Sequence, residues 1–210
     1  MILGVLAPPR PAPDPGGRAL GFSRLEALRQ DAEEWCAGRS WHWRAVLLAY
    51  LLWVGVHHLR DPFYSSLFGG ITFGIHELGH LLFAFAGKFL GVAGGSVAQV
   101  AAPAIAAALL YRQGDYFGVA VGGAWESFSL WNLATYIGDA RARELPLIGL
   151  SSDPIHDWNW LLGKLGILTW DHALAGLTRL TAFSIWASAV ALGRWLCWQM
   201  ARQKHLKGEG

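Results

Sequence analysis

The sequence predicts an all-α membrane protein, a helical bundle with about five to six transmembrane helices. Hydrophobic residues make up 53% of the 210 residues and charged residues only 15%, whereas a soluble domain carries about 25% charged residues. The charges gather mostly before residue 61, between 139 and 171, and after 193, which leaves long apolar stretches typical of membrane spans. Twelve tryptophans add to the pattern, because indole rings favour the membrane–water interface.

The net charge and the cysteines indicate which partners and sites the sequence does not favour. The net charge of +2 is too small to favour nucleic acid. Cys36 and Cys197 lie far apart and form no CxxC pair, so they predict neither a disulfide framework nor a cysteine zinc site. We therefore expect the lipid bilayer as the main surrounding, in an integral protein of the bacterial inner (cytoplasmic) membrane.

The chain before the first span has two parts. Residues 1–18 are rich in proline and glycine and predict a disordered tail. Residues 19–42 predict an amphipathic surface helix, since apolar side chains from Leu20 to Trp35 recur at helical spacing. This helix can lie along the membrane surface, or it can be a solvated helix that packs on the rest of the protein.

Residues 43–200 form the predicted membrane domain, and residues 201–210 form a basic tail. The expected spans are residues 43–57, 65–90, 97–111, 116–138 and 173–200, with a polar connector at 139–171. We expect Gly91–Gly95 to end the second span. At about 1.5 Å per residue, helices of these lengths can cross about 30 Å of hydrocarbon. The pairs Gly70/Gly74 and Gly118/Gly122 each form a GxxxG, which we assign to ordinary helix packing.

Two histidines one helical turn apart form the main chemical signal. They belong to the run His76-Glu77-Leu78-Gly79-His80 in an apolar stretch. Residues four apart on a helix point to the same side, so the imidazoles of His76 and His80 can hold one zinc ion together. Glu77 then lies beside the metal without binding it, where it can move a proton from water to a leaving amine. Because charged groups cost at least a few kcal/mol inside a membrane, we interpret the run as a metal site and not as a polar seam.

A hydrolytic zinc site needs a third protein ligand and an open position for water. Asp139, at the end of the fourth predicted span, is the first choice, although it can also be an interfacial helix end that pairs with Arg141.

Three other residues are alternative ligands. Glu126 matches the depth of the two histidines and can instead bond across helices to Gln99 or Ser96. His156 and Asp157 are adjacent in the polar connector and can instead cap the helical segment that follows them.

An HExxH run in a membrane helix, followed by an aspartate at the end of a later one, resembles the site-2 protease (M50-like) class of intramembrane zinc metalloproteases. Its members hold zinc through the two histidines and an aspartate from a motif of the form Asn-Leu-x-Pro-x-x-x-x-Asp-Gly. His76, Glu77 and His80 match the first motif residue by residue.

The second motif is matched more loosely. Asn132-Leu133 followed by Asp139 resembles it with a spacing one residue shorter, without the proline, and with Ala140 in place of the glycine. The resemblance covers about residues 66–140 and indicates a divergent member of the class.

The resemblance implies zinc-dependent hydrolysis of a peptide bond in or near a transmembrane segment. His76, His80 and Asp139 would hold Zn²⁺, Glu77 would be the general base, and Asn132 could steady the oxyanion. The partner would be a transmembrane protein substrate that unwinds locally, because an intact helix hides its peptide bonds. Residues 43–200 would then form a metalloprotease-like domain.

Two other functions stay open at this stage. One is a non-catalytic membrane protein with a structural or transport metal site, and the other is a metal-dependent membrane hydrolase of a non-peptide substrate. In each case water or ions need a polar path to the site. The candidates to line it are Gly94, Gly95, Ser96, Gln99, Glu126 and Ser127.

Overall fold

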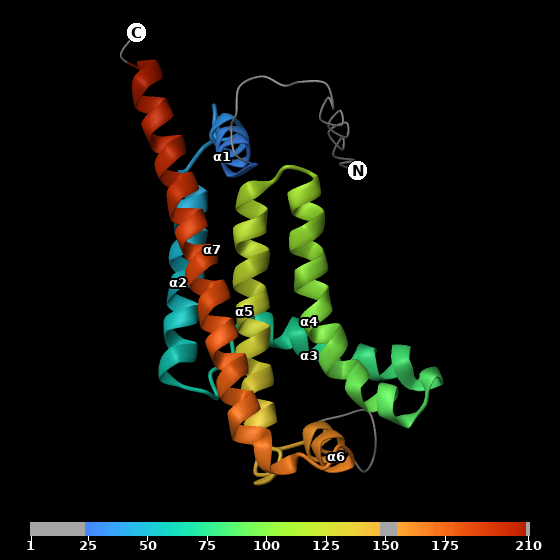
Figure 1. The fold of residues 1–210 in the computed structure, drawn as a ribbon. Coiled ribbons are helices and arrows are strands. Elements are labelled where there is room, and N and C mark those ends of the chain that lie inside the picture. Colours follow the sequence, from blue (N-terminus) through green and yellow to red (C-terminus); the bar gives the residue numbers. More distant parts are fainter. Residues whose placement is uncertain (1–23, 148–154, 209–210) are drawn as a thin grey trace.

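The computed structural model describes residues 24–147 and 155–208, which form helices joined by turns and contain no strand. The long helices are α2 (His42–Arg60), α3 (Leu67–Phe83), α4 (Lys88–Arg112), α5 (Tyr116–Gly138) and α7 (Asp171–Gly208). The short elements are α1 (Arg24–Trp35), α6 (Asp157–Lys164) and the 3₁₀ turns η1 (Ala84–Ala86) and η2 (Leu168–Trp170). Helices α5 and α7 lie against each other, with α2 packed on both and α4 packed on α5; α3 crosses their direction (Figure 1). The all-α prediction is therefore confirmed for the described residues.

Three helical stretches in this part of the chain are long and apolar enough to cross a membrane. They are Leu67–Ala86, Lys88–Arg112 and Leu168–Lys204. The predicted spans 43–57 and 116–138 do form helices, α2 and α5, but neither belongs to this set. A physical reason is visible in α5, which lies between other helices and buries polar side chains such as Glu126 and Ser129. The predicted total of five to six spans is not confirmed.

The core holds α5 in the middle of the bundle. Phe128 and Trp131 of α5 are buried together with Leu51 of α2 and Trp186 of α7. The Trp186 indole also donates a hydrogen bond to the carbonyl oxygen of Leu51, at 3.3 Å. Large buried aromatic side chains contribute much of the stabilisation of such a core, so α5 is a fixed wall for whatever lies beside it.

The turn between α3 and α4 falls at Gly87, and the expected helix end at Gly91–Gly95 is wrong. Gly87 has a φ of 94°, a backbone conformation that favours glycine. Residues 91–95 lie inside α4, where their small size lets two backbones approach. A Cβ on Gly94 would lie 2.6 Å from the carbonyl oxygen of Gly79 on α3. The glycines therefore close the α3–α4 hairpin instead of ending a helix.

The two GxxxG pairs differ in their use. A Cβ on Gly122 would lie 2.9 Å from the Ala107 Cβ, so the pair Gly118/Gly122 includes a close contact between α5 and α4, as predicted. A Cβ on Gly70 or Gly74 would meet no atom of another element within 4 Å, so this pair makes no close helix contact in the described part of the chain.

The helices near the two ends of the chain have other bounds than the predicted segments. α1 lies within the predicted surface segment and packs on α7, where Gln203 donates to the carbonyl oxygen of Glu33 at 2.9 Å. This contact with α7 is compatible with both alternatives, a helix along the membrane surface and a solvated helix packed on the protein. α7 continues through Gly208, so residues 201–208 of the predicted basic tail are helical. The predicted tail at residues 1–18 lies outside the described residues.

Candidate metal centre

Helix α3 brings the two histidines of the HExxH run together. The ring centroids of His76 and His80 are 4.7 Å apart, and His76 is buried. The helix is held in place by Trp125 of α5, whose indole donates to the hydroxyl of Thr72 at 3.1 Å. The predicted convergence of the two imidazoles is therefore present.

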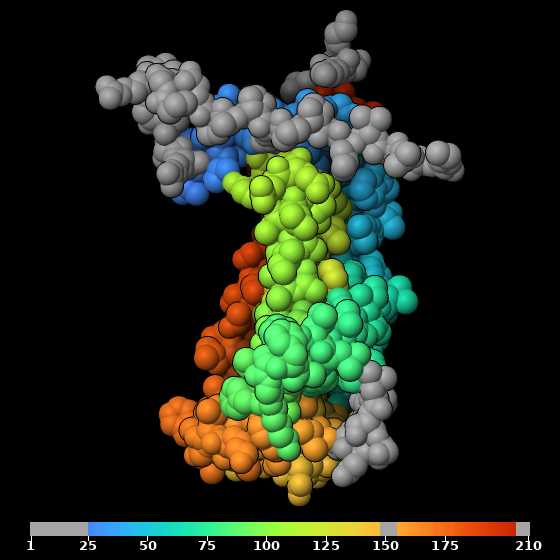
Figure 2. Space-filling model, turned by 90° about the vertical axis from the view of Figure 1, so that its right-hand side faces the viewer, coloured from blue at the N-terminus to red at the C-terminus, as the bar shows by residue number. Residues whose placement is uncertain are grey.

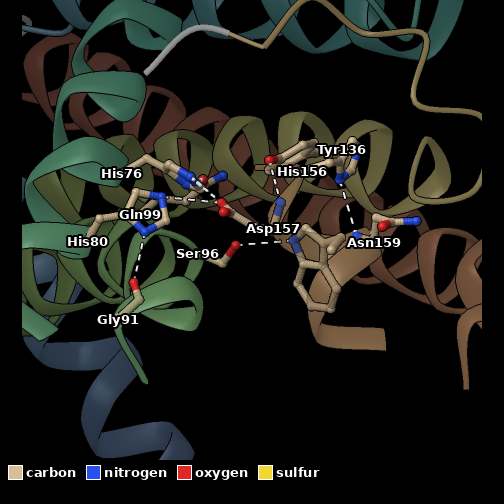
Figure 3. Close-up of polar contacts among 10 residues, drawn as sticks. His76, His80, Gly91, Ser96, Gln99, Tyr136, His156, Asp157 and Asn159 are labelled. Carbon is tan, nitrogen blue, oxygen red and sulfur yellow. Dashed lines mark hydrogen bonds and ion pairs between the residues drawn. The ribbon is translucent and has the colours of Figure 1, made fainter. Parts of the chain in front are cut away.

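Each imidazole is oriented through its Nδ1 atom. His76 Nδ1 lies 2.8 Å from Gln99 Oε1, and His80 Nδ1 lies 2.9 Å from the carbonyl oxygen of Gly91 (Figure 3). Both partners accept hydrogen bonds, so the proton of each neutral ring is on Nδ1 and the lone pair is on Nε2. Such contacts are the usual way in which a protein orients histidine ligands of a metal.

The third group at this site is Asp157. Its Oδ2 lies 3.1 Å from His76 Nε2 and 3.2 Å from His80 Nε2. The three possible ligand atoms, one from each residue, all lie within 4.8 Å of one another. With zinc–ligand bonds of about 2.0–2.1 Å, neighbouring ligands of a tetrahedral ion are about 3.3 Å apart. The observed spacings fit that geometry.

Asp139, the first choice from the sequence, lies elsewhere. Its carboxylate accepts from the backbone N–H groups of Glu144 (2.9 Å) and Leu145 (3.1 Å) and from His156 Nε2 (3.2 Å). These contacts engage it at the end of α5, where it stabilises the turn that follows. The expected pairing with Arg141 is also replaced, because Arg141 binds Asp171 instead. The carboxylate that the structure brings beside the two histidines is thus that of Asp157, one of the alternative candidates, and not that of Asp139.

The N-terminus of α6 places Asp157. His156 is the N-cap of this helix and accepts from the backbone N–H of Asn159 through Nδ1, at 3.2 Å. Asp157 is the first helical residue, and its backbone N–H donates to the hydroxyl of Tyr136 at 2.9 Å. That N–H has no partner within its own helix, so the tyrosine satisfies it. His156 thus forms the helix cap that the sequence allowed for this pair of residues, while Asp157 lies beside the two histidines.

The charge of Asp157 also suits a cation. Burial alone would raise the pKa of its carboxyl, but the Nε2–H groups that His76 and His80 present when their rings are protonated lower it, so that without a metal the pKa of Asp157 lies below its usual value. An ionised, buried carboxylate between two neutral imidazoles is a strong ligand for a divalent ion.

Gly95 leaves the space that an ion would need. A Cβ at this position would lie 2.6 Å from both His76 Nε2 and His80 Nε2. The backbone of α4 therefore passes directly over the two ligand nitrogens, and only a glycine keeps the volume between them open. The residues present fit a metal ion in donor type, spacing and room.

The metal group borders a cavity of about 700 Å³. Glu77, Asn132 and Tyr136 line this cavity together with the three candidate ligands. Gln99 lines it as well, whereas the other residues proposed for the polar path do not border it. Figure 2 shows the α3–α4 hairpin, in teal and green, directly above the orange segment that contains α6.

Known proteins provide no template for this site. No protein-family model, curated protein or solved structure matches the chain. The chemistry of the site therefore has to be inferred from its own residues.

Glu126 does not join the group. It is buried on α5, and its Oε2 atom has no hydrogen-bond partner among the residues that the structure describes. The partners expected for it are engaged elsewhere: Gln99 binds His76, and Ser96 accepts from the indole of Trp158 at 3.1 Å. The alternative assignment of Glu126 as a ligand is therefore not supported by the geometry.

Sequence reasoning assigned no role to Tyr136, and it placed Gly95 only in a helix end and in the polar path. Neither belongs to a motif, and each acts through its position in space: Gly95 by close approach, Tyr136 through its contact with Asp157. The spacing of Asn132 and Tyr136, four residues apart on one helix face, is the signal that could have linked Tyr136 to the site.

Proposed function

We propose that this chain is a zinc-dependent membrane hydrolase that cleaves a peptide bond in or near a transmembrane segment. The observation that carries the proposal is the convergence of His76 Nε2, His80 Nε2 and Asp157 Oδ2, with both Nδ1 atoms bound to other partners. Two histidines and one carboxylate are a ligand set of catalytic zinc, which keeps a fourth position for water. A structural zinc site would fill all four positions with protein ligands.

The residues around this site have the groups that hydrolysis requires. When bound, zinc supplies Lewis-acid chemistry, because it polarises a carbonyl and lowers the pKa of water to about 7. The Glu77 carboxylate borders the same cavity and can accept a proton from the attacking water, then deliver it to the leaving amine. Asn132 and Tyr136 can donate hydrogen bonds to the oxygen of the scissile carbonyl.

The walls of the cavity favour an apolar substrate segment. Phe63, Phe73, Leu81, Leu133 and Leu147 are among the residues that line it. Apolar side chains next to the scissile bond would bury their surface here. A membrane helix would have to unwind locally to present that bond, because its peptide groups are bonded within the helix.

The proposed site departs from the site-2 protease pattern in its third ligand. The histidines and Glu77 occupy the HExxH positions, but the carboxylate comes from α6 and not from the aspartate at the end of a preceding long helix. We therefore propose a related chemistry with its own ligand arrangement.

Metal analysis of the purified protein tests the ligand set. We expect about one zinc per wild-type chain and loss of this zinc in His80→Ala and in Asp157→Ala, because each variant leaves two ligands. Asp139→Ala should still carry zinc when the metal is saturating. Zinc retained in Asp157→Ala, or lacking in the wild type, would contradict the proposed centre.

The hydrolytic role is tested with Glu77→Gln, which keeps the shape of the side chain but removes the base. Membranes from cells that produce the wild type should contain new peptide termini within transmembrane segments, detected by mass spectrometry of protein termini. Glu77→Gln should bind zinc normally and yield none of these termini. If both proteins give the same termini, the peptidase proposal fails and the metal site is left with a non-proteolytic role.

A further inference from the structure

The contacts of Asp139 and His156 connect the metal centre to the end of α5. His156 Nδ1 accepts from the Asn159 backbone N–H, which places the ring proton on Nε2. His156 Nε2 then donates to Asp139 Oδ2 at 3.2 Å, with both side chains almost fully buried. The two nitrogens of one ring thus join the cap of α6 to a carboxylate on α5.

Asp139 is itself fixed, so it can serve as an anchor. It follows the last residue of α5 and accepts from the backbone N–H groups of Glu144 and Leu145. A second contact runs in parallel, because the Asn159 side-chain amide donates to the carbonyl oxygen of Ala140 at 2.8 Å. The first turn of α6 is therefore bound to the end of α5 through side chains on both elements.

Helix α6 needs such anchors. It has eight residues, and isolated helices of that length are not stable in water. Asp157 is its first residue, so any movement of the N-terminus moves the carboxylate away from the imidazoles. A metal ligand has to be held to within about 0.5 Å of its productive position.

We propose that Asp139 and His156 are positioning residues, which set the place of the Asp157 carboxylate although neither contacts the metal site. The proposal rests on the zinc centre proposed above. It also gives a role to the aspartate that the sequence pattern favours as a ligand: Asp139 acts on the site through His156 and the cap of α6.

The two nitrogens of His156 can be tested separately. In His156→Asn the amide oxygen stands near the Nδ1 position and keeps the cap, but the side chain no longer reaches Asp139. In His156→Gln the amide nitrogen stands near the Nε2 position and keeps the contact with Asp139, but the cap is lost. The zinc dissociation constant of each variant is measured by competition with a chelator.

We expect Asp139→Ala and His156→Asn each to weaken zinc binding by about 10–100-fold, the range for residues that orient metal ligands. The double variant should be no weaker than either single variant, because both remove the same contact. His156→Gln should bind zinc more tightly than His156→Asn. The absorption bands of bound Co²⁺ should shift in the two weak variants, which reports a changed ligand geometry independently of activity.

Asp115→Ala is the matched control. Asp115 caps α5 at its other end, where its side chain accepts from the Gly118 N–H at 2.9 Å. This variant loses a helix cap and some stability, but its zinc affinity and Co²⁺ spectrum should equal those of the wild type.

Zinc affinities of Asp139→Ala and His156→Asn within about twofold of the wild type, with unchanged Co²⁺ bands, would overturn the positioning role while the zinc centre stands. Additive losses in the double variant would overturn it too. A wild-type chain that binds no zinc would overturn both the centre and the positioning role, and the His80→Ala and Asp157→Ala variants would then match the wild type.

Discussion

A single glycine decides how much room the two ligand nitrogens have. Gly95 faces them from α4, and a Cβ there would lie 2.6 Å from each Nε2 atom. That distance is shorter than any normal contact between carbon and nitrogen, so a methyl group would force the imidazoles or the backbone of α4 to move. The residue has no chemistry of its own, and its contribution is the space it leaves.

Gly95→Ala should therefore lose zinc. The expected loss of affinity exceeds the roughly 10–100-fold typical of residues that only orient a ligand, because the new methyl group takes the volume of the ion itself. Metal content and circular dichroism of the purified variant check this result. Gly74→Ala on α3 is the control, since its Cβ meets no atom within 4 Å, and it should keep full zinc content.

At the scale of the element, a proline in helix α4 leaves one backbone carbonyl oxygen without its usual donor in the helix. Pro103 is buried in α4 and has no N–H for the carbonyl oxygen of Gln99, four residues earlier. Ser129 of α5 donates its hydroxyl to that oxygen at 2.9 Å and accepts from the Gln99 side chain at 3.1 Å through its own carbonyl oxygen. The free carbonyl thus becomes part of the link that fixes Gln99 against His76.

Two buried serines on α5 allow a matched test of this link. Ser129→Ala leaves the Gln99 carbonyl oxygen without a donor, which should cost about 1–3 kcal/mol of unfolding free energy. Ser127→Ala should cost less, because the Ser127 hydroxyl bonds only within its own helix, to the carbonyl oxygen of Ala124. Denaturant unfolding in detergent measures both, and equal losses would argue against a special role of the bond across the helices.

At the scale of the whole molecule, an ion pair joins the two ends of the connector between α5 and α7. Arg141 Nε lies 2.8 Å from Asp171 Oδ2, and the Asp171 side chain has no exposed surface. Arg141 follows the end of α5, and Asp171 is the first residue of α7. The pair therefore joins the two ends of the segment that contains α6 and Asp157. The pair therefore supports the metal site at a distance.

Arg141→Ala should lower the midpoint of thermal unfolding, because it leaves a buried carboxylate without its charged partner. Arg141→Lys should lower it less, since a charged donor remains. The midpoint of thermal unfolding compares the three proteins. A midpoint in Arg141→Ala equal to that of the wild type would contradict the structural weight given to this contact.

The elements whose apolar pattern is continuous could be predicted closely. The fourth predicted span, 116–138, coincides with α5, and the first, 43–57, lies within α2. The error at Gly91–Gly95 has a physical cause, because glycine both ends helices and lets them pack closely, and the sequence alone does not separate these uses. The predicted number of spans is not confirmed, and α5 shows one reason: it packs between other helices and buries polar residues, which lowers its mean hydropathy.

The sequence by itself determined the pair of imidazoles and the glutamate beside them, because that geometry is local: the four-residue spacing of the two histidines along one helix fixes it. The tertiary structure decided the third carboxylate, since Asp139 and Asp157 both follow α5 in the chain and only the docking of α6 brings one of them to the histidines. It also decided which backbone passes over the ligands and which side chains orient them. Contacts between residues far apart in the chain depend on how the helices pack, and the residue pattern along one segment does not determine that packing.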